Sequence, residues 1–170
     1  MRLTGLLAAT LLALVSCSPQ SPGAAQSATS AAVAVHPVSG LPVVALTVTH
    51  ASKRHSFRVE VARSDDEQER GLMFRTAMGA DEGMIFPYSP PRRVAFWMHN
   101  TVIPLDIVFV GADRRIINVA ANAVPYSDAP LASAGPVSNV LEINGGLAAK
   151  LGIGPGDAVD WQLPPTPHIR

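Results

Sequence analysis

Short runs in which apolar and polar residues alternate dominate the middle of the chain. The clearest are Val43–His50 (VVALTVTH) and residues 57–62 (FRVEVA). Alternation with a period of two, combined with many β-branched residues, is typical of half-buried β-strands. Other short apolar runs predict six more strands, at residues 83–86, 94–98, 105–110, 116–120, 140–143 and 158–163. We expect Pro87 to end the third strand and residues 88–91 to form a loop.

Helical patterns are few and short. Residues 64–67 (SDDE) have the spacing of a capping box, which predicts a helix over residues 65–73 with a last turn weakened by Gly71. Residues 147–151 (LAAKL) predict one or two helical turns that end at Gly152. The expected fold is therefore mainly β: a compact small barrel or sandwich of seven to eight short strands with one or two short helices.

The N-terminal pattern differs from that of the rest of the chain. Arg2 precedes an apolar stretch over residues 6–15, which is too short to span a bilayer and is typical of a secretory signal. The stretch ends in residues 14–17 (LVSC), which resemble a bacterial lipobox. This resemblance implies cleavage before Cys17 and lipidation of its thiol, so we expect two acyl chains or more to anchor the mature protein stably.

These features divide the chain into four parts. Residues 1–16 are interpreted as a lipoprotein-type signal peptide and residues 17–40 as a flexible tether, because residues 18–40 are rich in Ser, Ala, Pro and Gly and carry no charge. Residues 41–163 are expected to form one mostly-β domain, followed by a Pro-rich tail at 164–170. The predicted location is the periplasmic face of a bacterial envelope, with an outer-membrane anchor.

Charge and cysteine content narrow the classes of function. The chain has 13 basic and 13 acidic residues, which argues against a nucleic-acid partner because no basic surface is available. The single cysteine excludes an intramolecular disulfide and a cysteine-based zinc site. We expect no metal, no cofactor and a monomer.

Several segments together resemble family 192 of the domains of unknown function. The longest is residues 96–109 (FWMHNTVIPLDIVF), in which His99 stands where the family often has lysine. The others are residues 69–75 (ERGLMFR), 83–86 (GMIF), 140–146 (VLEINGG), 151–153 (LGI) and 156–157 (GD). The resemblance covers about residues 55–162 and implies a small, mainly-β, frequently exported domain with no agreed activity.

Two acidic residues stand within apolar runs and suggest a polar pocket. Asp106 and Glu142 each need a charge or a hydrogen-bond partner, because a carboxyl group among apolar neighbours otherwise has a raised pKa. Trp97 could form a stacking wall. The remaining candidates are His99 as a proton carrier, Arg70 or Arg75 as an anion clamp, and Asn100 and Asn144 as hydrogen-bond partners.

Three functions are compatible with these residues. The favoured hypothesis is an envelope-anchored domain that binds a small molecule, a glycan or an envelope protein without catalysis. The second is a glycan-directed envelope hydrolase that uses Asp106 and Glu142 as paired carboxylates. The third is a purely structural lipoprotein, which predicts no cleft beside Trp97.

Overall fold

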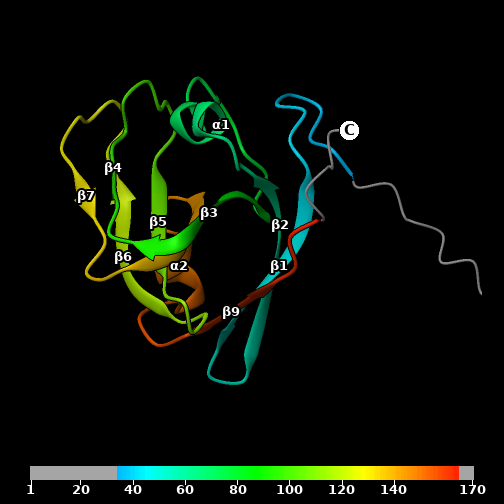
Figure 1. Ribbon diagram of the computed structural model, residues 1–170, viewed down its shortest axis with the longest axis vertical. Helices are drawn as coiled ribbons and strands as arrows, with labels where there is room; N and C mark the ends of the chain where they lie inside the picture. The colour runs from blue at the N-terminus through cyan, green and yellow to red at the C-terminus, as the bar shows by residue number, and fades with distance from the viewer. Residues whose placement is uncertain (1–33, 165–170) are drawn as a thin grey trace, which may run out of the picture. The chain divides into compact units, whose positions relative to one another are not determined.

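The computed structural model describes residues 34–164 and confirms a mainly β fold with two short helices (Figure 1). In these residues there are nine strands, where the sequence predicts seven to eight; the strand not predicted is β7. The elements in chain order are β1 Val43–His50, β2 Lys53–Val61, α1 Asp65–Arg70, β3 Glu82–Arg92, β4 Ala95–Phe96, β5 Leu105–Val110, β6 Ile116–Ala123, β7 Leu131–Ala132, β8 Val137–Asn144, α2 Leu147–Leu151 and β9 Ala158–Trp161.

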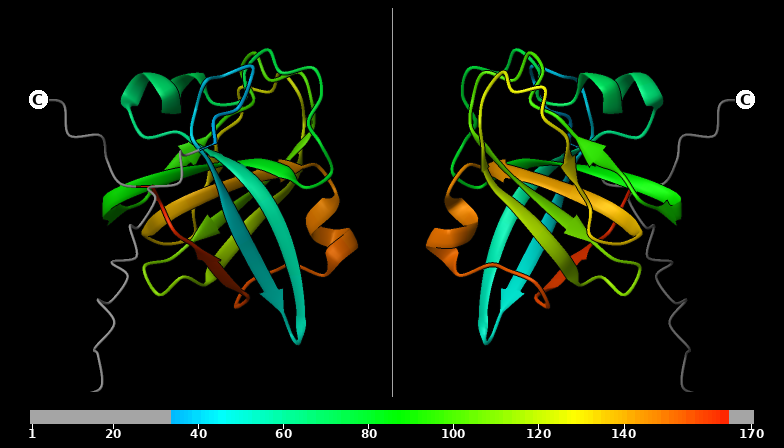
Figure 2. Two further views of the ribbon diagram at one scale, coloured as in Figure 1. Left: turned by 90° about the vertical axis from the view of Figure 1, so that its right-hand side faces the viewer. Right: turned by 90° about the vertical axis from the view of Figure 1, so that its left-hand side faces the viewer.

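Seven strands form one curled sheet in the order β6-β5-β8-β3-β2-β1-β9. All neighbours are antiparallel except β2 and β3, which are parallel and are connected through α1. The edge strands approach each other at an isolated bridge between Arg115 and Ala158. Figure 2 shows β1 and β2 as a long hairpin whose turn projects beyond the other strands. The two-residue strands β4 and β7 pair separately.

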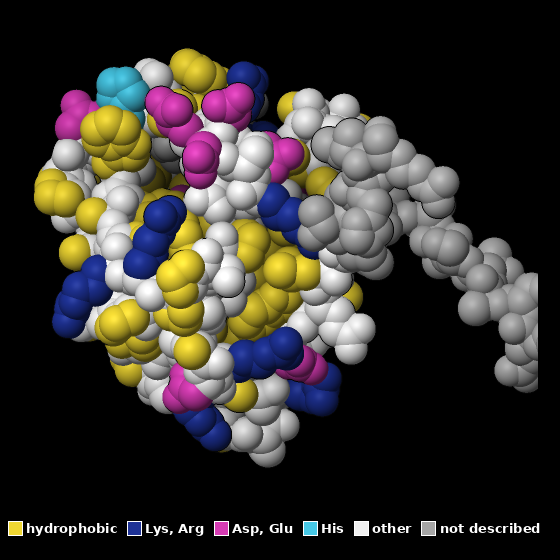
Figure 3. Space-filling view, in the orientation of Figure 1, with side chains coloured by type: hydrophobic (Ala, Val, Ile, Leu, Met, Phe, Trp, Pro, Cys, Tyr) yellow, Lys and Arg dark blue, Asp and Glu magenta, His cyan; other side chains and the backbone are white. Residues whose placement is uncertain are grey.

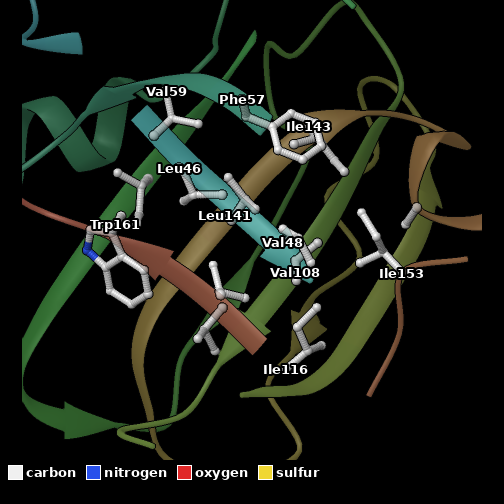
Figure 4. Packing of buried hydrophobic residues seen from close by; sticks show 14 of the residues in the cluster. Leu46, Val48, Phe57, Val59, Val108, Ile116, Leu141, Ile143, Ile153 and Trp161 are labelled. Atoms are coloured by element: carbon white, nitrogen blue, oxygen red, sulfur yellow. The ribbon is translucent and has the colours of Figure 1, made fainter. Parts of the chain in front are cut away.

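Hydrophobic side chains pack on both faces of the central strands, which explains why all six residues of β5 are buried. The first core joins β1, β2, β9 and one face of β3, β5 and β8, and Figure 4 shows its side chains pointing toward one another. The second core lies on the opposite face and includes Met84, Phe86, Ile107, Phe109 and Val140. A residue on β5 or β8 therefore faces one core or the other.

Several predicted boundaries differ from the observed ones, and two of these differences affect the surroundings of the site. The helix α1 ends at Arg70 rather than at residue 73, because Gly71 adopts a positive φ of 45° and stops the helical path. Strand β3 continues through Pro87 to Arg92 instead of giving way to a loop. Pro87 still pairs with Asn139, and the register shift after it accommodates the missing amide hydrogen.

The signal peptide, Cys17 and most of the predicted tether and tail lie outside the described residues. Residues 34–40 make contacts with the domain: Val35 bridges Pro42, and Ser39 donates a hydrogen bond to Glu60. Contacts with the domain therefore begin before residue 41. Within residues 34–164, neither helix has the length and apolar character needed to cross a bilayer.

Candidate functional site

The two acidic residues that the sequence places in one site face opposite sides of the sheet. In the pairing of β5 with β8, Asp106 stands opposite Ile143, and Ile107 stands opposite Glu142. Directly opposite residues share a face, and successive residues alternate between faces. Asp106 therefore shares the face of Ile143, in the first core, whereas Glu142 shares the face of Ile107, in the second. The hypothesis of a hydrolase with paired carboxylates is wrong for this reason.

Asp106 is fully buried and its carboxylate accepts three backbone hydrogen bonds. Oδ1 accepts from the amides of Asn122 at 2.7 Å and Gly146 at 2.9 Å, and Oδ2 accepts from the amide of Ala148 at 2.7 Å. Ala148 lies in the first turn of α2, whose N-cap, Gly146, has no side chain to offer. Asp106 thus caps α2 from a neighbouring strand and is sealed from any ligand.

Glu142 is equally buried, but its carboxyl group lacks such partners. The residue is 5% exposed, and Oε2 has no hydrogen-bond partner among the described residues. Burial removes water from the carboxylate and raises the pKa of Glu142 to about 8. The side chain is therefore mostly protonated at neutral pH and can donate a hydrogen bond.

Glu142 lines a pocket of about 400 Å³ between the end of α1, β3 and β4. Residues at the end of α1 and just beyond it form one side, and aromatic side chains from β3, β4 and the following residue form another. The lining residues are Gln68, Glu69, Arg70, Gly71, Leu72, Met73, Phe86, Tyr88, Ala95, Phe96, Trp97, Thr101 and Glu142. This is the cleft beside Trp97 that a binding function requires.

Trp97 gives this pocket an open aromatic wall. Its side chain is 54% exposed, and its ring lies 5.4 Å from that of His99, centroid to centroid. His99 does not line the pocket; its Nδ1 lies 2.8 Å from Oδ1 of Asp128. The imidazole therefore supports the indole from outside the pocket, and an exposed indole is available to stack on a ligand.

Tyr88 and Gln68 form a wall that the sequence did not indicate. Burial raises the pKa of Tyr88 to about 12, with Glu142 adding to the shift and Arg92 opposing it, so the phenol stays protonated. Gln68 donates hydrogen bonds to the carbonyls of Ala62 and Pro87, at 3.3 and 3.0 Å. The sequence predicts a loop at residues 88–91 and therefore does not indicate Tyr88. Because β3 continues through Pro87, the alternation from Phe86 places Tyr88 on the same face.

Three other predicted site residues have structural roles outside this pocket. Arg75 forms an ion pair with Glu60 at 3.0 Å. Asn144 donates from Nδ2 to the carbonyl of Gly79 at 2.8 Å. Asn100 has a φ of 53°, and its carbonyl accepts a hydrogen bond from the amide of Phe74 at 2.9 Å. The structure thus brings together Arg70, Trp97 and Glu142 and separates the other candidates from them.

Across residues 34–164, no group of three or more His, Cys, Asp or Glu side chains is arranged to hold a metal ion. The two histidines of the β1–β2 hairpin, His50 and His55, are two register positions apart and not directly opposite, since His50 pairs with Lys53 and His55 with Val48. The imidazole of His50 instead contacts the carboxylate of Asp157 at 3.1 Å.

Comparisons with known proteins identify relatives of this domain. The family model DUF192, described as an uncharacterized ACR, matches residues 46–161. A crystal structure of a protein of unknown function from Novosphingobium aromaticivorans DSM 12444 is 65% identical; the match covers 78% of this chain and 94% of that one, with a TM-score of 0.75. A crystal structure of a proposed transcription regulator from Sinorhizobium meliloti 1021 is 38% identical over 71% of this chain and 95% of that one, with a TM-score of 0.69. No curated protein matches the chain.

Proposed function

The chain belongs to the DUF192 family, and we propose that its domain binds a hydroxylated small molecule, such as a glycan ring, between Trp97 and Glu142 without altering it chemically. One observation carries the proposal: a buried carboxyl group, one of whose oxygens has no partner among residues 34–164, lines a pocket whose other wall is a half-exposed indole. Pockets that bind small molecules combine apolar and aromatic walls with a few polar groups of this kind.

The chemistry of the two residues suits a hydroxylated ring. A protonated Glu142 donates a hydrogen bond to a ligand hydroxyl and can accept one through its other oxygen. Trp97 offers a flat apolar surface for the face of the ring. Arg70 is exposed at the rim of the pocket and adds guanidinium donors for further oxygen atoms.

The lining of the pocket supports binding without turnover. Asp106, the second carboxylate that hydrolysis would use, is sealed on the opposite face of the sheet. No serine, cysteine or histidine is among the described residues that line the pocket, and Tyr88 holds its proton too tightly to act as a base at neutral pH. Two other lining residues carry groups of this kind, but the hydroxyl of Thr101 donates to the carbonyl of His99 at 3.2 Å and Glu69 is exposed to solvent, so neither forms a buried pair with Glu142.

We also infer that the domain acts in the cell envelope, attached to the membrane through a lipid on Cys17. The lipobox-like residues 14–17 and the uncharged residues 18–40 support this location. Expression of the full chain in a bacterium should give a membrane-bound, lipid-modified product by mass spectrometry. The Cys17→Ser variant should lose both properties; a lipid-free native product would contradict the inference.

Tryptophan fluorescence can test binding directly, because the chain has two tryptophans and only Trp97 lines this pocket. In a Trp161→Phe background, saturable changes in Trp97 emission are expected with oligosaccharides of N-acetylglucosamine, and bound ligand should protect Trp97 from acrylamide quenching. By calorimetry, Trp97→Ala and Glu142→Leu should each weaken binding about tenfold or more, as loss of a central contact does.

Phe74→Ala supplies the matched control, since Phe74 is a 62% exposed aromatic residue outside the pocket. It should leave the affinity unchanged. Equal losses in Trp97→Ala and Phe74→Ala, or no saccharide bound, would contradict the proposed site. Cleaved saccharide in the reaction mixture, detected by mass spectrometry, would contradict binding without turnover.

A further inference from the structure

A larger hollow of about 840 Å³ lies on the other side of Tyr88 and Gln68. Figure 3 shows this face, with hydrophobic side chains on the floor of a hollow and Lys or Arg side chains around it. The basic side chains that line the hollow are Arg63, Arg92 and Arg114. We propose that this arginine groove binds a phosphorylated polyol, such as a sugar phosphate, and that it is a site separate from the Trp97 pocket.

Two of the arginines are held against aromatic rings. The guanidinium carbon of Arg92 lies 4.8 Å from the ring centroid of Tyr88, and that of Arg114 lies 4.7 Å from the ring centroid of Trp161. Stacking fixes the plane of a guanidinium group and leaves its edge free to donate hydrogen bonds. Planar, paired N–H donors match the oxygen atoms of a phosphate group.

The groove carries more positive charge from arginines than negative charge from acidic residues. Arg114 pairs with Asp160 at 2.7 Å, but within the described residues neither Arg63 nor Arg92 forms an ion pair. Arg63 donates to the carbonyl of Pro164 instead. Asp65 is the single acidic residue among the described residues that line the groove. An anion would therefore be attracted to this face.

Asn139 indicates that the ligand also carries a hydrogen-bond donor. It lines the groove, is 5% exposed, and its Oδ1 has no partner in residues 34–164. Its Nδ2 already donates to Oγ of Ser138 at 3.0 Å. Because Asn139 lines the groove, a ligand donor that reaches Oδ1 would satisfy this acceptor. A phosphate dianion only accepts hydrogen bonds, so a hydroxyl group is needed to satisfy Asn139.

The two tryptophans allow the two sites to be tested independently. Trp161 lines the arginine groove and Trp97 lines the other pocket. In a Trp97→Phe protein, titration with glucose 6-phosphate at constant ionic strength should change Trp161 emission saturably. Glucose should give no response, and inorganic phosphate should bind about tenfold more weakly, because it lacks the additional hydroxyl contacts.

Arg92→Ala is the informative variant, because Arg92 is exposed and its removal should not unfold the domain. It should weaken glucose 6-phosphate binding about tenfold, as loss of a charge-assisted contact does. Arg54→Ala removes another exposed arginine, one that lies outside the groove, and should leave the affinity unchanged. Thermal unfolding of both variants verifies that each is folded.

Three results would overturn the proposal. The first is no response, by fluorescence or calorimetry, to glucose 6-phosphate in a folded protein. The second is equal affinity for glucose 6-phosphate and inorganic phosphate, which would remove the polyol from the assignment. The third is an equal effect of Arg92→Ala and Arg54→Ala, which would mean that binding depends on general charge and not on this groove.

Discussion

Asp106 and Glu142 lie on neighbouring strands at adjacent register positions, and both are almost completely buried. Asp106 accepts hydrogen bonds from three backbone amides. Glu142 lines a pocket and has an oxygen without a partner in the described part of the chain. The residues have the same functional group and similar burial, and they differ in which face of the sheet they occupy.

This difference shows that an acidic residue in an apolar strand is not by itself a sign of function. On the first face, the start of α2 presents amides that need an acceptor, so the carboxylate completes the fold. On the second face, no described residue donates a hydrogen bond to Oε2 of Glu142, so nothing in the fold stabilises an ionised carboxylate there. A buried group that the fold leaves unsatisfied is the better candidate for meeting a ligand.

The largest expected effect is the loss of stability in Asp106→Ala. Three backbone amides, one buried and two partly buried, would lose a charged acceptor, and hydrogen bonds to charged groups contribute about 1.5–3 kcal/mol each. We expect the free energy of unfolding to fall by roughly 5 kcal/mol, as measured by urea denaturation. Ligand binding by the fraction that remains folded should be unchanged, because the Trp97 pocket lies on the opposite face.

Asp106→Asn serves as the graded comparison. It keeps one acceptor oxygen and places an amide group against the remaining backbone donor, so its stability should lie between those of the wild type and Asp106→Ala. A loss of less than about 1 kcal/mol in Asp106→Ala would contradict the capping role, since it is below the cost of one orphaned donor.

Patterns within single segments predicted much of the fold. Val43–His50, Leu105–Val110 and Leu147–Leu151 have the predicted bounds, because apolar periodicity and turn residues act locally. Strand β7 and the continuation of β3 past Pro87 were not predicted, since both depend on pairing with distant residues. Local pattern carries no information about such partners.

The candidate site was predicted only in part for a related reason. Arg70, Trp97 and Glu142 do converge on one pocket, as the apolar setting of Glu142 and the aromatic Trp97 suggested. Whether Asp106 joins them depends on the register between β5 and β8, and a shift of one residue reverses the face of every side chain. That register is set by the whole sheet and cannot be derived from either strand alone.

The next expected effect, after that of Asp106→Ala, is a dependence of stability on pH that arises from Glu142. Glu142 has a pKa of about 8 in the folded protein, against 4.5 as its ordinary value. Between these values the folded state holds a proton that the unfolded state has released. The contribution of Glu142 to stability is therefore greatest below the lower pKa and falls as pH rises, by about 1.4 kcal/mol per pH unit and on the order of 5 kcal/mol in total, until the pH passes 8.

Glu142→Gln isolates this contribution, because glutamine resembles the protonated acid and does not titrate. The variant and the wild type should have similar free energies of unfolding at pH 5, and the variant should be the more stable at pH 8. Denaturation curves at closely spaced pH values give the difference directly, and other titrating groups cancel in it. If the free energies of unfolding of the two proteins change in parallel with pH, Glu142 does not have a raised pKa in the folded protein. That result would contradict its burial in the protonated form.

A third buried carboxylate, Glu60, extends the comparison to a case in which the partner is a cation. Glu60 and Arg75 form an ion pair at 3.0 Å whose side chains are 4% and 11% exposed, and Ser39 donates to the same carboxylate. Removing one partner of a buried pair leaves the other charge uncompensated, so Arg75→Met should lower the free energy of unfolding by about 3 kcal/mol. The double variant Arg75→Met, Glu60→Gln should recover part of this loss, which a double-mutant cycle measures as a coupling energy.

Because Arg75 does not line the Trp97 pocket, saccharide binding should be unaffected. If the losses in free energy of unfolding of the two single variants simply add, Glu60 is stabilised by contacts other than Arg75. The ion pair would then not explain why Glu60 is buried.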